Sequence, residues 1–136
     1  MWVFTVDGFY SVVQKPADRK RNVIVIRSRC RDDLERMLKR LKRKDKIVES
    51  RLTDYPFRVF TSKDVWARYL SLAAEAINYG NFKDKITEVL GSERHNIYAS
   101  IWSTLLRLQA PHRTIKNNRR LGYDERYPDI WRSDLY

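Results

Sequence analysis

The dipeptide Asp7-Gly8 constrains the fold of this 136-residue chain more than any other feature. It separates two short runs of β-branched and aromatic residues, 2–6 and 9–13. An Asp-Gly pair between such runs is the strongest short-range signal for a β-hairpin, because these residue types tolerate the backbone angles of a tight turn. The sequence therefore predicts a chain that starts with two antiparallel strands.

Three further segments complete the predicted sheet. Residues 23–26 are all β-branched and apolar, which is typical of a buried central strand. Residues 47–48 and 57–60 are two more short candidates, and the polar, proline-containing stretch 54–56 between them favours a turn. The predicted sheet is antiparallel or mixed.

The first helix is predicted where the apolar residues change to helical spacing. It begins near Asp32, and its apolar face consists of Leu34, Met37, Leu38 and Leu41. Basic residues repeat the same spacing two positions further on: Arg36, Lys39, Arg40 and Arg43. Two residues correspond to a rotation of about 200° around a helix, so we expect these cations to point into solvent, opposite the buried face.

Two more helices are predicted in the second half of the chain. Thr61 or Ser62 is a suitable N-cap for one that ends before Gly80. The other begins at Ser92 and ends before Pro111, and a short helical turn over residues 82–90 precedes it. The apolar side chains of the last helix recur at Ile97, Ile101, Leu105 and Leu108. Aromatic residues expected in the core or in helix contacts are Trp66, Tyr69, Tyr98 and Trp102.

This order of strands and helices is typical of an α+β fold, in which helices cover a small mixed or antiparallel sheet. A ferredoxin-like sandwich is one candidate arrangement. We expect residues 1–110 to form a single domain and residues 111–136 to form a basic and aromatic C-terminal extension. The chain length and a hydrophobic content of 43% suit one folded domain.

The net charge of +11 is concentrated in one part of the chain. Residues 15–51 contain 15 Lys and Arg against six Asp and Glu, so this segment alone carries +9. A concentrated positive field attracts polyanions, which makes nucleic acid the first partner class to consider. The candidate binding residues are Arg36, Lys39, Arg40, Lys42, Arg43, Lys44, Arg19, Lys20 and Arg21.

Two interpretations of the basic helix face remain open. Acids at the start of a helix and cations at its end suit the helix dipole, so a solvated surface explains much of the pattern. However, Arg36/Arg40 and Lys39/Arg43 are like-charge pairs four residues apart, and each costs about 0.2–0.5 kcal/mol with no acid to offset it. We expect this cost to reflect a binding role.

The C-terminal segment mixes cations, amides and aromatic rings. Cations bind phosphates and aromatic faces stack on unpaired bases, so the segment has the ingredients of a single-stranded nucleic-acid site. Alternatively, the aromatic residues pack on the domain itself or on another chain, which the small net charge of +2 over residues 111–136 favours. The residues concerned are Arg113, Lys116, Arg119, Arg120, Tyr127 and Trp131.

No residue pattern predicts catalysis, a cofactor or a metal site. With two histidines and one cysteine, no spacing resembles a zinc site, the carboxylates are scattered, and the four glycines are isolated. Cys30 lies between Arg29 and Arg31, whose charges would lower the pKa of an exposed thiol. We therefore expect a protein that binds without catalysing a reaction.

The cysteine content and the hydropathy pattern indicate a compartment. One cysteine cannot form an internal disulfide, and residues 1–4 lack the charged and long apolar regions of a secretory signal. No apolar run approaches the roughly 18 residues that a membrane-spanning helix needs. We expect a cytoplasmic protein with no membrane partner.

Three segments carry a resemblance: residues 1–4 with 7–13, residues 77–83 (INYGNFK) and residues 94–103 (RHNIYASIWS). Together they resemble a group of small bacterial and phage proteins without an assigned activity, over most of residues 1–109. The resemblance implies one compact prokaryotic or phage-borne domain and transfers no site residue. The first helix is more basic here than the group would suggest, and the chain after Gln109 looks like an addition.

The leading prediction is a non-catalytic protein that engages a nucleic-acid backbone, DNA or RNA, through the basic helix face. The alternative is a protein-interaction module, such as a subunit of a nucleoprotein complex or a phage-encoded inhibitor of a host defence complex, of the anti-CRISPR kind. In that case the C-terminal segment contacts the partner, and aromatic and arginine anchors provide the specificity.

Overall fold

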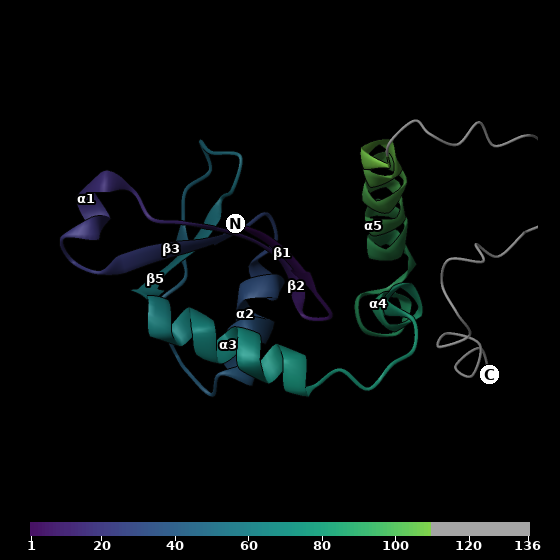
Figure 1. Cartoon of the computed structure of the whole chain (residues 1–136). Coiled ribbons are helices and arrows are strands. Elements are labelled where there is room, and N and C mark those ends of the chain that lie inside the picture. The colour runs from purple at the N-terminus through teal and green to yellow at the C-terminus, as the bar shows by residue number, and fades with distance from the viewer. Residues whose placement is uncertain (110–136) are drawn as a thin grey trace, which may run out of the picture.

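Five strands form one antiparallel sheet in the computed structural model, which describes residues 1–109 (Figure 1). The strand order is β1-β2-β3-β5-β4, so β3 is the central strand, as its apolar sequence predicts. The α+β class is confirmed. The chain begins with a hairpin and not with a βαβ unit, so a ferredoxin-like arrangement finds no support. The strands are β1 (Trp2–Thr5), β2 (Gly8–Val13), β3 (Val23–Ser28), β4 (Val48–Glu49) and β5 (Phe57–Ser62).

The predicted hairpin is present, but its turn lies one residue earlier than expected. Thr5 pairs with Gly8, so Val6 and Asp7 form the two-residue turn and Gly8 begins β2. Gly8 is required there for space, because a Cβ atom at this position would lie 2.3 Å from Cγ of Asp33. The Asp-Gly signal located the hairpin correctly and misplaced its turn.

Helices α2 (Arg31–Arg40) and α3 (Lys63–Glu75) cover one face of the sheet (Figure 1). The N-cap of α3 is Ser62, as predicted, and its hydroxyl accepts a hydrogen bond of 3.5 Å from the Val65 N–H. Apolar side chains from both helices meet alternate residues of the three central strands. This core consists of Tyr10, Val12, Ile24, Ile26, Leu34, Met37, Leu38, Val59, Trp66 and Tyr69.

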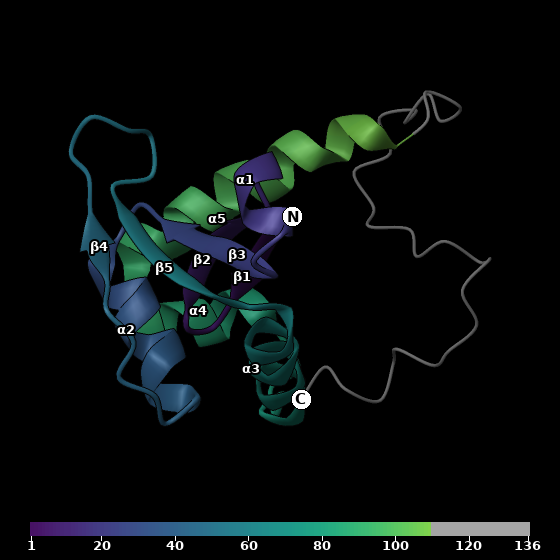
Figure 2. The ribbon, with the colours of Figure 1, turned by 90° about the vertical axis from the view of Figure 1, so that its left-hand side faces the viewer.

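Helices α4 (Phe82–Leu90) and α5 (Ser92–Leu105) pack beside the hairpin turn (Figures 1 and 2). A second, smaller cluster of buried residues joins them to the hairpin: Val6, Ile86 and Tyr98. The helical turn predicted over residues 82–90 is therefore a full helix. The second cluster fixes α5 at the hairpin end of the sheet.

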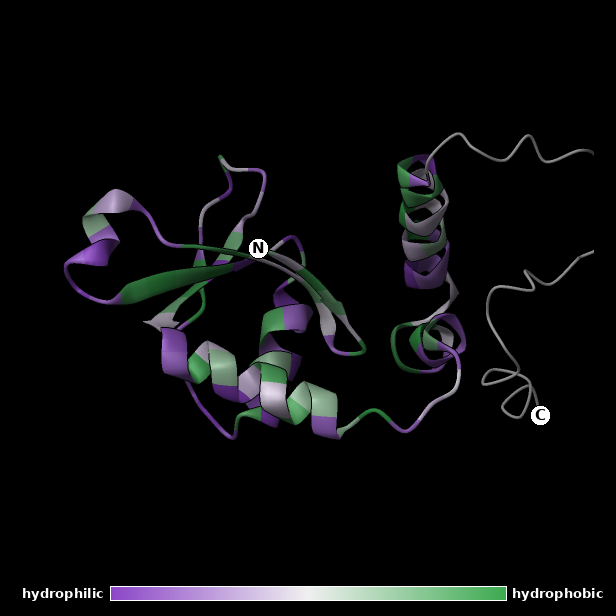
Figure 3. Cartoon of the chain, viewed as in Figure 1, coloured by the Kyte–Doolittle hydropathy of each residue, from purple (hydrophilic) through white to green (hydrophobic). Residues whose placement is uncertain are grey.

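The apolar face predicted for α5 is wrong in part. The helix packs against α4 and contacts the hairpin through Tyr98 and Ile101, and these contacts bury only part of its apolar face. Other apolar side chains of α5 and the turn after it face outward, and Figure 3 shows apolar residues along the whole helix. The exposed fractions are 50% for Ile97, 53% for Trp102, 52% for Leu105 and 80% for Leu108.

Two short elements complete the described chain: α1 (Pro16–Arg19) and the 3-10 turn η1 (Leu106–Leu108). None of the helices in residues 1–109 has the length and apolar character needed to span a membrane. The predicted C-terminal extension, 111–136, lies outside the described residues.

Candidate nucleic-acid interface

The hairpin turn is held by two arginines of α2. Arg40 forms a bidentate ion pair with the Asp7 carboxylate, with distances of 2.5 Å from Nε and 2.7 Å from Nη2. Arg36 Nε donates to the Asp7 carbonyl oxygen at 2.6 Å. The Tyr69 hydroxyl of α3 donates to the same carboxylate at 3.1 Å. The turn is therefore fastened to both helices that cover the sheet.

A second carboxylate, Asp33, lies beneath the same turn and is almost completely buried, with 1% of its surface exposed. It accepts hydrogen bonds from Arg36 at 2.6 Å and from both terminal nitrogens of Arg94 at 2.9 and 3.0 Å. The Phe9 N–H donates to it at 3.0 Å. The hydrogen bonds from Arg94 to the Asp33 carboxylate raise the pKa of the Arg94 guanidinium above its ordinary value. Asp33 thus joins α2, α5 and the hairpin through charge-assisted hydrogen bonds.

The predicted orientation of the basic helix face is wrong for Arg36 and Arg40. Both side chains are only partly exposed, and both reach around the helix to the hairpin turn. The rotation of about 200° between the apolar and basic rows overlooks this, because a long arginine side chain on the flank of a helix can reach its neighbours. The expected lack of an acid is also wrong, since Asp7 and Asp33 offset these two charges.

The lysines at the end of α2 are different. Lys39, Lys42 and Lys44 are exposed, and none forms an ion pair with an acidic side chain of residues 1–109. Helix α2 ends in a Schellman motif: the Arg43 N–H donates to the Leu38 carbonyl at 2.9 Å, and the Lys42 N–H donates to the Lys39 carbonyl at 3.0 Å. These lysines are named the lysine cluster below.

Lys42 has a left-handed backbone conformation, with φ of 54°. Glycine is the usual residue at this position of a Schellman motif, because a side chain in the left-handed region costs about 1 kcal/mol. In the described chain, only Asn22 shares a positive φ among residues other than glycine. Folding alone therefore does not favour a lysine at position 42.

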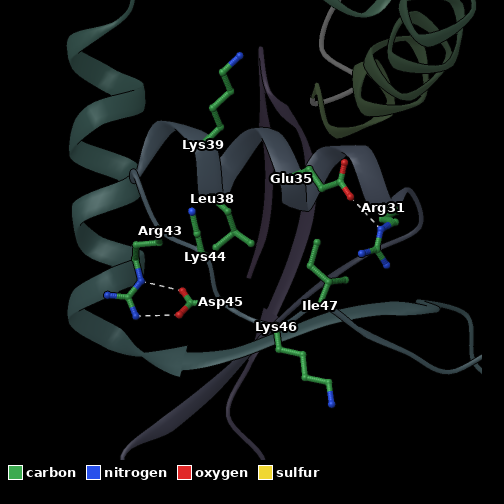
Figure 4. Close-up of a pocket in the computed structure, with 9 residues that line it drawn as sticks. All are labelled: Arg31, Glu35, Leu38, Lys39, Arg43, Lys44, Asp45, Lys46 and Ile47. Carbon is green, nitrogen blue, oxygen red and sulfur yellow. Dashed lines mark hydrogen bonds and ion pairs between the residues drawn. The ribbon is translucent and has the colours of Figure 1, made fainter.

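A hollow of about 480 Å³ lies between α2 and residues 43–47 (Figure 4). Leu38 and Ile47 give it apolar walls. Two ion pairs also line it, Arg31 with Glu35 at 2.8 Å and Arg43 with Asp45 at 2.7 Å. Figure 4 shows Lys39 and Lys46 pointing away from each other on opposite sides of the hollow.

The second basic segment, Arg19, Lys20 and Arg21, lies at and just after the end of α1. Figures 1 and 2 both show α1 at the end of the sheet remote from α2. The two basic regions are thus separate surfaces. The predicted tail residues, from Arg113 to Trp131, lie outside the described residues.

The Cys30 thiol does not have the lowered pKa that its arginine neighbours suggest. Partial burial raises the pKa of Cys30, and the nearby Asp33 carboxylate raises it further. Arg94 acts in the opposite direction but does not outweigh these effects. The thiol therefore carries less thiolate at neutral pH than a free cysteine.

One arginine pair was missed by the sequence analysis. Arg27 and Arg58 are direct partners on β3 and β5, on the sheet face opposite α2 and α3. The buried strand was predicted over residues 23–26 only, whereas β3 continues to Ser28 and so includes Arg27. The signal available was the period of two residues along each strand.

Within residues 1–109, no group of His, Cys, Asp and Glu side chains is arranged to hold a metal ion. No protein-family model matches this sequence, and no curated protein or solved structure is significantly similar to it. The predicted resemblance to small bacterial and phage proteins stays a prediction. Any functional assignment therefore rests on the chemistry of this chain's own residues.

Proposed function

We propose that the protein binds the phosphate backbone of a nucleic acid through the lysine cluster at the end of α2. The observation that carries the proposal is Lys42, which occupies a backbone position that favours glycine and has no acidic partner among the described residues. Lys39 and Lys44 add two more unpaired charges beside it. A residue kept at a cost to folding is typical of a functional site.

The proposed contacts determine how binding depends on the nucleic-acid sequence and on salt. Lysine ammonium groups bind phosphates as point charges and do not read base edges, so they provide affinity without sequence choice. Each neutralised phosphate releases counterions, and this makes the affinity fall as salt rises. The ligand class is duplex DNA or RNA, because the cluster offers charge without an aromatic side chain for stacking.

The test is a salt titration of binding to a labelled duplex, with the triple variant K39Q/K42G/K44Q. The wild-type plot of log affinity against log salt should have a slope of about −3 or steeper. The variant should flatten that slope by about 3, because three phosphate contacts are lost. Glycine is placed at position 42 so that the variant keeps or gains stability, which a thermal melt verifies.

The matched control is R19Q/K20Q/R21Q, which removes the same charge at the remote end of the sheet. It should change the slope much less than the triple variant of the lysine cluster. Equal flattening by both variants would mean that only the net charge matters, and it would refute the assignment to α2. An unchanged slope in K39Q/K42G/K44Q would refute it as well.

A second candidate function is a protein-interaction module, which the exposed apolar side chains of α5 favour. Leu105 is 52% exposed and Leu108 is 80% exposed. A pull-down from native host lysate with and without nuclease separates the candidates. A stoichiometric protein that survives nuclease and is lost in L105S/L108S would support the second. Nucleic acid recovered only without nuclease, with no stoichiometric protein, would support the first.

A further inference from the structure

The sheet face opposite α2 and α3 carries one straight row of side chains across all five strands. The pairing partners are Trp2 with Ser11, Ser11 with Arg27, Arg27 with Arg58, and Arg58 with Val48. Since paired residues of antiparallel strands point to the same side, all five lie on this face. Figures 1 and 2 show α1 near one end of the sheet and α5 near the other.

The two arginines at the centre of this row are directly opposed and have no acidic partner. Like charges in direct cross-strand pairs destabilise a sheet. Neither Arg27 nor Arg58 forms an ion pair with an acid of residues 1–109. In addition, Arg27 Nε is buried without a hydrogen-bond partner. A buried donor without a partner is costly, and an anion bound beside the pair would offset the repelling charges.

Tyr55, in the loop between β4 and β5, holds both guanidinium groups in place. Its ring lies 4.7 Å from the guanidinium carbon of Arg27, and its carbonyl oxygen accepts a hydrogen bond of 3.4 Å from Arg58 Nε. Arg29 packs over the same ring at 5.2 Å. Ser11 also accepts a hydrogen bond of 2.7 Å from Arg27. The arginines are therefore preorganised, which lowers the entropy lost when an anion binds.

Exposed aromatic rings flank the arginine pair. Trp2 stands in the same row and is 69% exposed. Phe60 follows Arg58 by two residues on β5, so it lies on the same face, and it is 50% exposed. Neighbouring strands are about 4.8 Å apart, so the Trp2 backbone lies roughly 10 Å from that of Arg27. An aromatic side chain and a phosphate-binding group at this separation can contact adjacent parts of one nucleotide chain.

We infer that this face, named the arginine-aromatic face, binds single-stranded nucleic acid. Arg27 and Arg58 would hold a backbone phosphate, and Trp2 and Phe60 would stack on unpaired bases. The exposed rings of Trp2 and Phe60 suit bases that are free of a duplex, since paired bases do not offer their flat sides. The inference adds a second surface to the proposed function and does not depend on the lysine cluster.

The test is fluorescence anisotropy with a labelled thymidine oligonucleotide of about 12 nucleotides, which one small domain can cover. R27Q and R58Q should each weaken binding at least about tenfold, because a charge-assisted contact to phosphate is lost. W2L should weaken binding about tenfold through lost stacking. The matched control is R68Q on α3, which removes an exposed arginine from the other side of the molecule and should leave the affinity within about twofold.

Stability measurements distinguish a loss of binding from a loss of folding. R58Q removes a like-charge repulsion, so it should unfold at the same or a higher temperature than the wild type. The oligonucleotide should raise the melting temperature of the wild type and of R68Q, but raise that of R58Q much less. Wild-type affinity in R27Q and R58Q would overturn the inference. An equal loss in R68Q would also overturn it, because binding would then follow net charge alone.

The assignments of the two surfaces can be refuted independently. If K39Q/K42G/K44Q loses only the duplex, and R27Q and R58Q lose the single strand, both assignments stand. If R27Q and R58Q bind the single strand normally while K39Q/K42G/K44Q loses both ligands, the arginine-aromatic face is refuted and the lysine cluster remains. If R27Q and R58Q lose the single strand while K39Q/K42G/K44Q binds the duplex normally, only the arginine-aromatic face remains.

Discussion

Replacing Gly8 with alanine should strongly destabilise the fold. The new Cβ would lie 2.3 Å from Cγ and 2.5 Å from Cβ of Asp33. Asp33 has no room to move away, because Arg36, Arg94 and the Phe9 N–H all hold its carboxylate. We expect a loss of about 3 kcal/mol or more in the free energy of unfolding, since overpacking and a broken buried network add together. Urea unfolding followed by circular dichroism measures it.

Gly91 provides the matched control for this substitution. It has a φ of +86°, and a Cβ there would meet no atom within 4 Å. G91A should therefore cost only about 1 kcal/mol from the backbone conformation. If G8A were as stable as G91A, the contact between the hairpin and Asp33 would not have the importance assigned to it.

Replacing Asp33 with asparagine should be the second most damaging change. The substitution keeps the shape of the side chain but leaves Arg36 and Arg94 without their shared anion in a mostly buried site. Removing one partner of a buried ion pair costs about 3–5 kcal/mol, because the remaining charge stays desolvated. Helix α5 should also loosen from the hairpin, so amide hydrogen exchange near Arg94 should accelerate.

The control for D33N is E35Q on the same helix. Glu35 pairs with Arg31 at 2.8 Å, and both side chains are about half exposed, at 53% and 48%. An exposed pair contributes about 0–1 kcal/mol, so E35Q should change stability little. A D33N variant with the stability of E35Q would show that the buried carboxylate does not hold the elements together.

Except for α1, the strands and helices of residues 1–90 could be predicted because local pattern and tertiary packing agree there. Residues 23–26 have the composition of a central strand, and β3 occupies the centre of the sheet. Ser62 caps α3 as its side chain suggests. For α5, the regular apolar spacing predicts a long buried face, but the hairpin and α4 together bury only part of it. The spacing of apolar residues along the helix does not show how much surface is available to cover them.

The candidate sites were harder to predict because they depend on contacts between distant parts of the chain. Arg36 and Arg40 look like solvent-facing cations in the sequence, and only the position of the hairpin turn shows that Asp7 and Asp33 neutralise them. That Lys42 has no acidic partner within residues 1–109 likewise depends on the tertiary structure. Arg27 and Arg58 are 31 positions apart, and their direct pairing depends on the strand register. The charge pattern overestimated how many cations of residues 15–51 are free of an acidic partner within residues 1–109.

The most direct test of the central claim is a nuclear magnetic resonance titration of the protein with a short duplex at low salt. Binding through the lysine cluster predicts that the largest amide shifts fall on residues 39–46, and that these shifts shrink as salt is raised. Shifts concentrated on residues 97–108 of the α5 region, or no shifts at any duplex concentration, would contradict the claim that the end of α2 binds a nucleic-acid backbone.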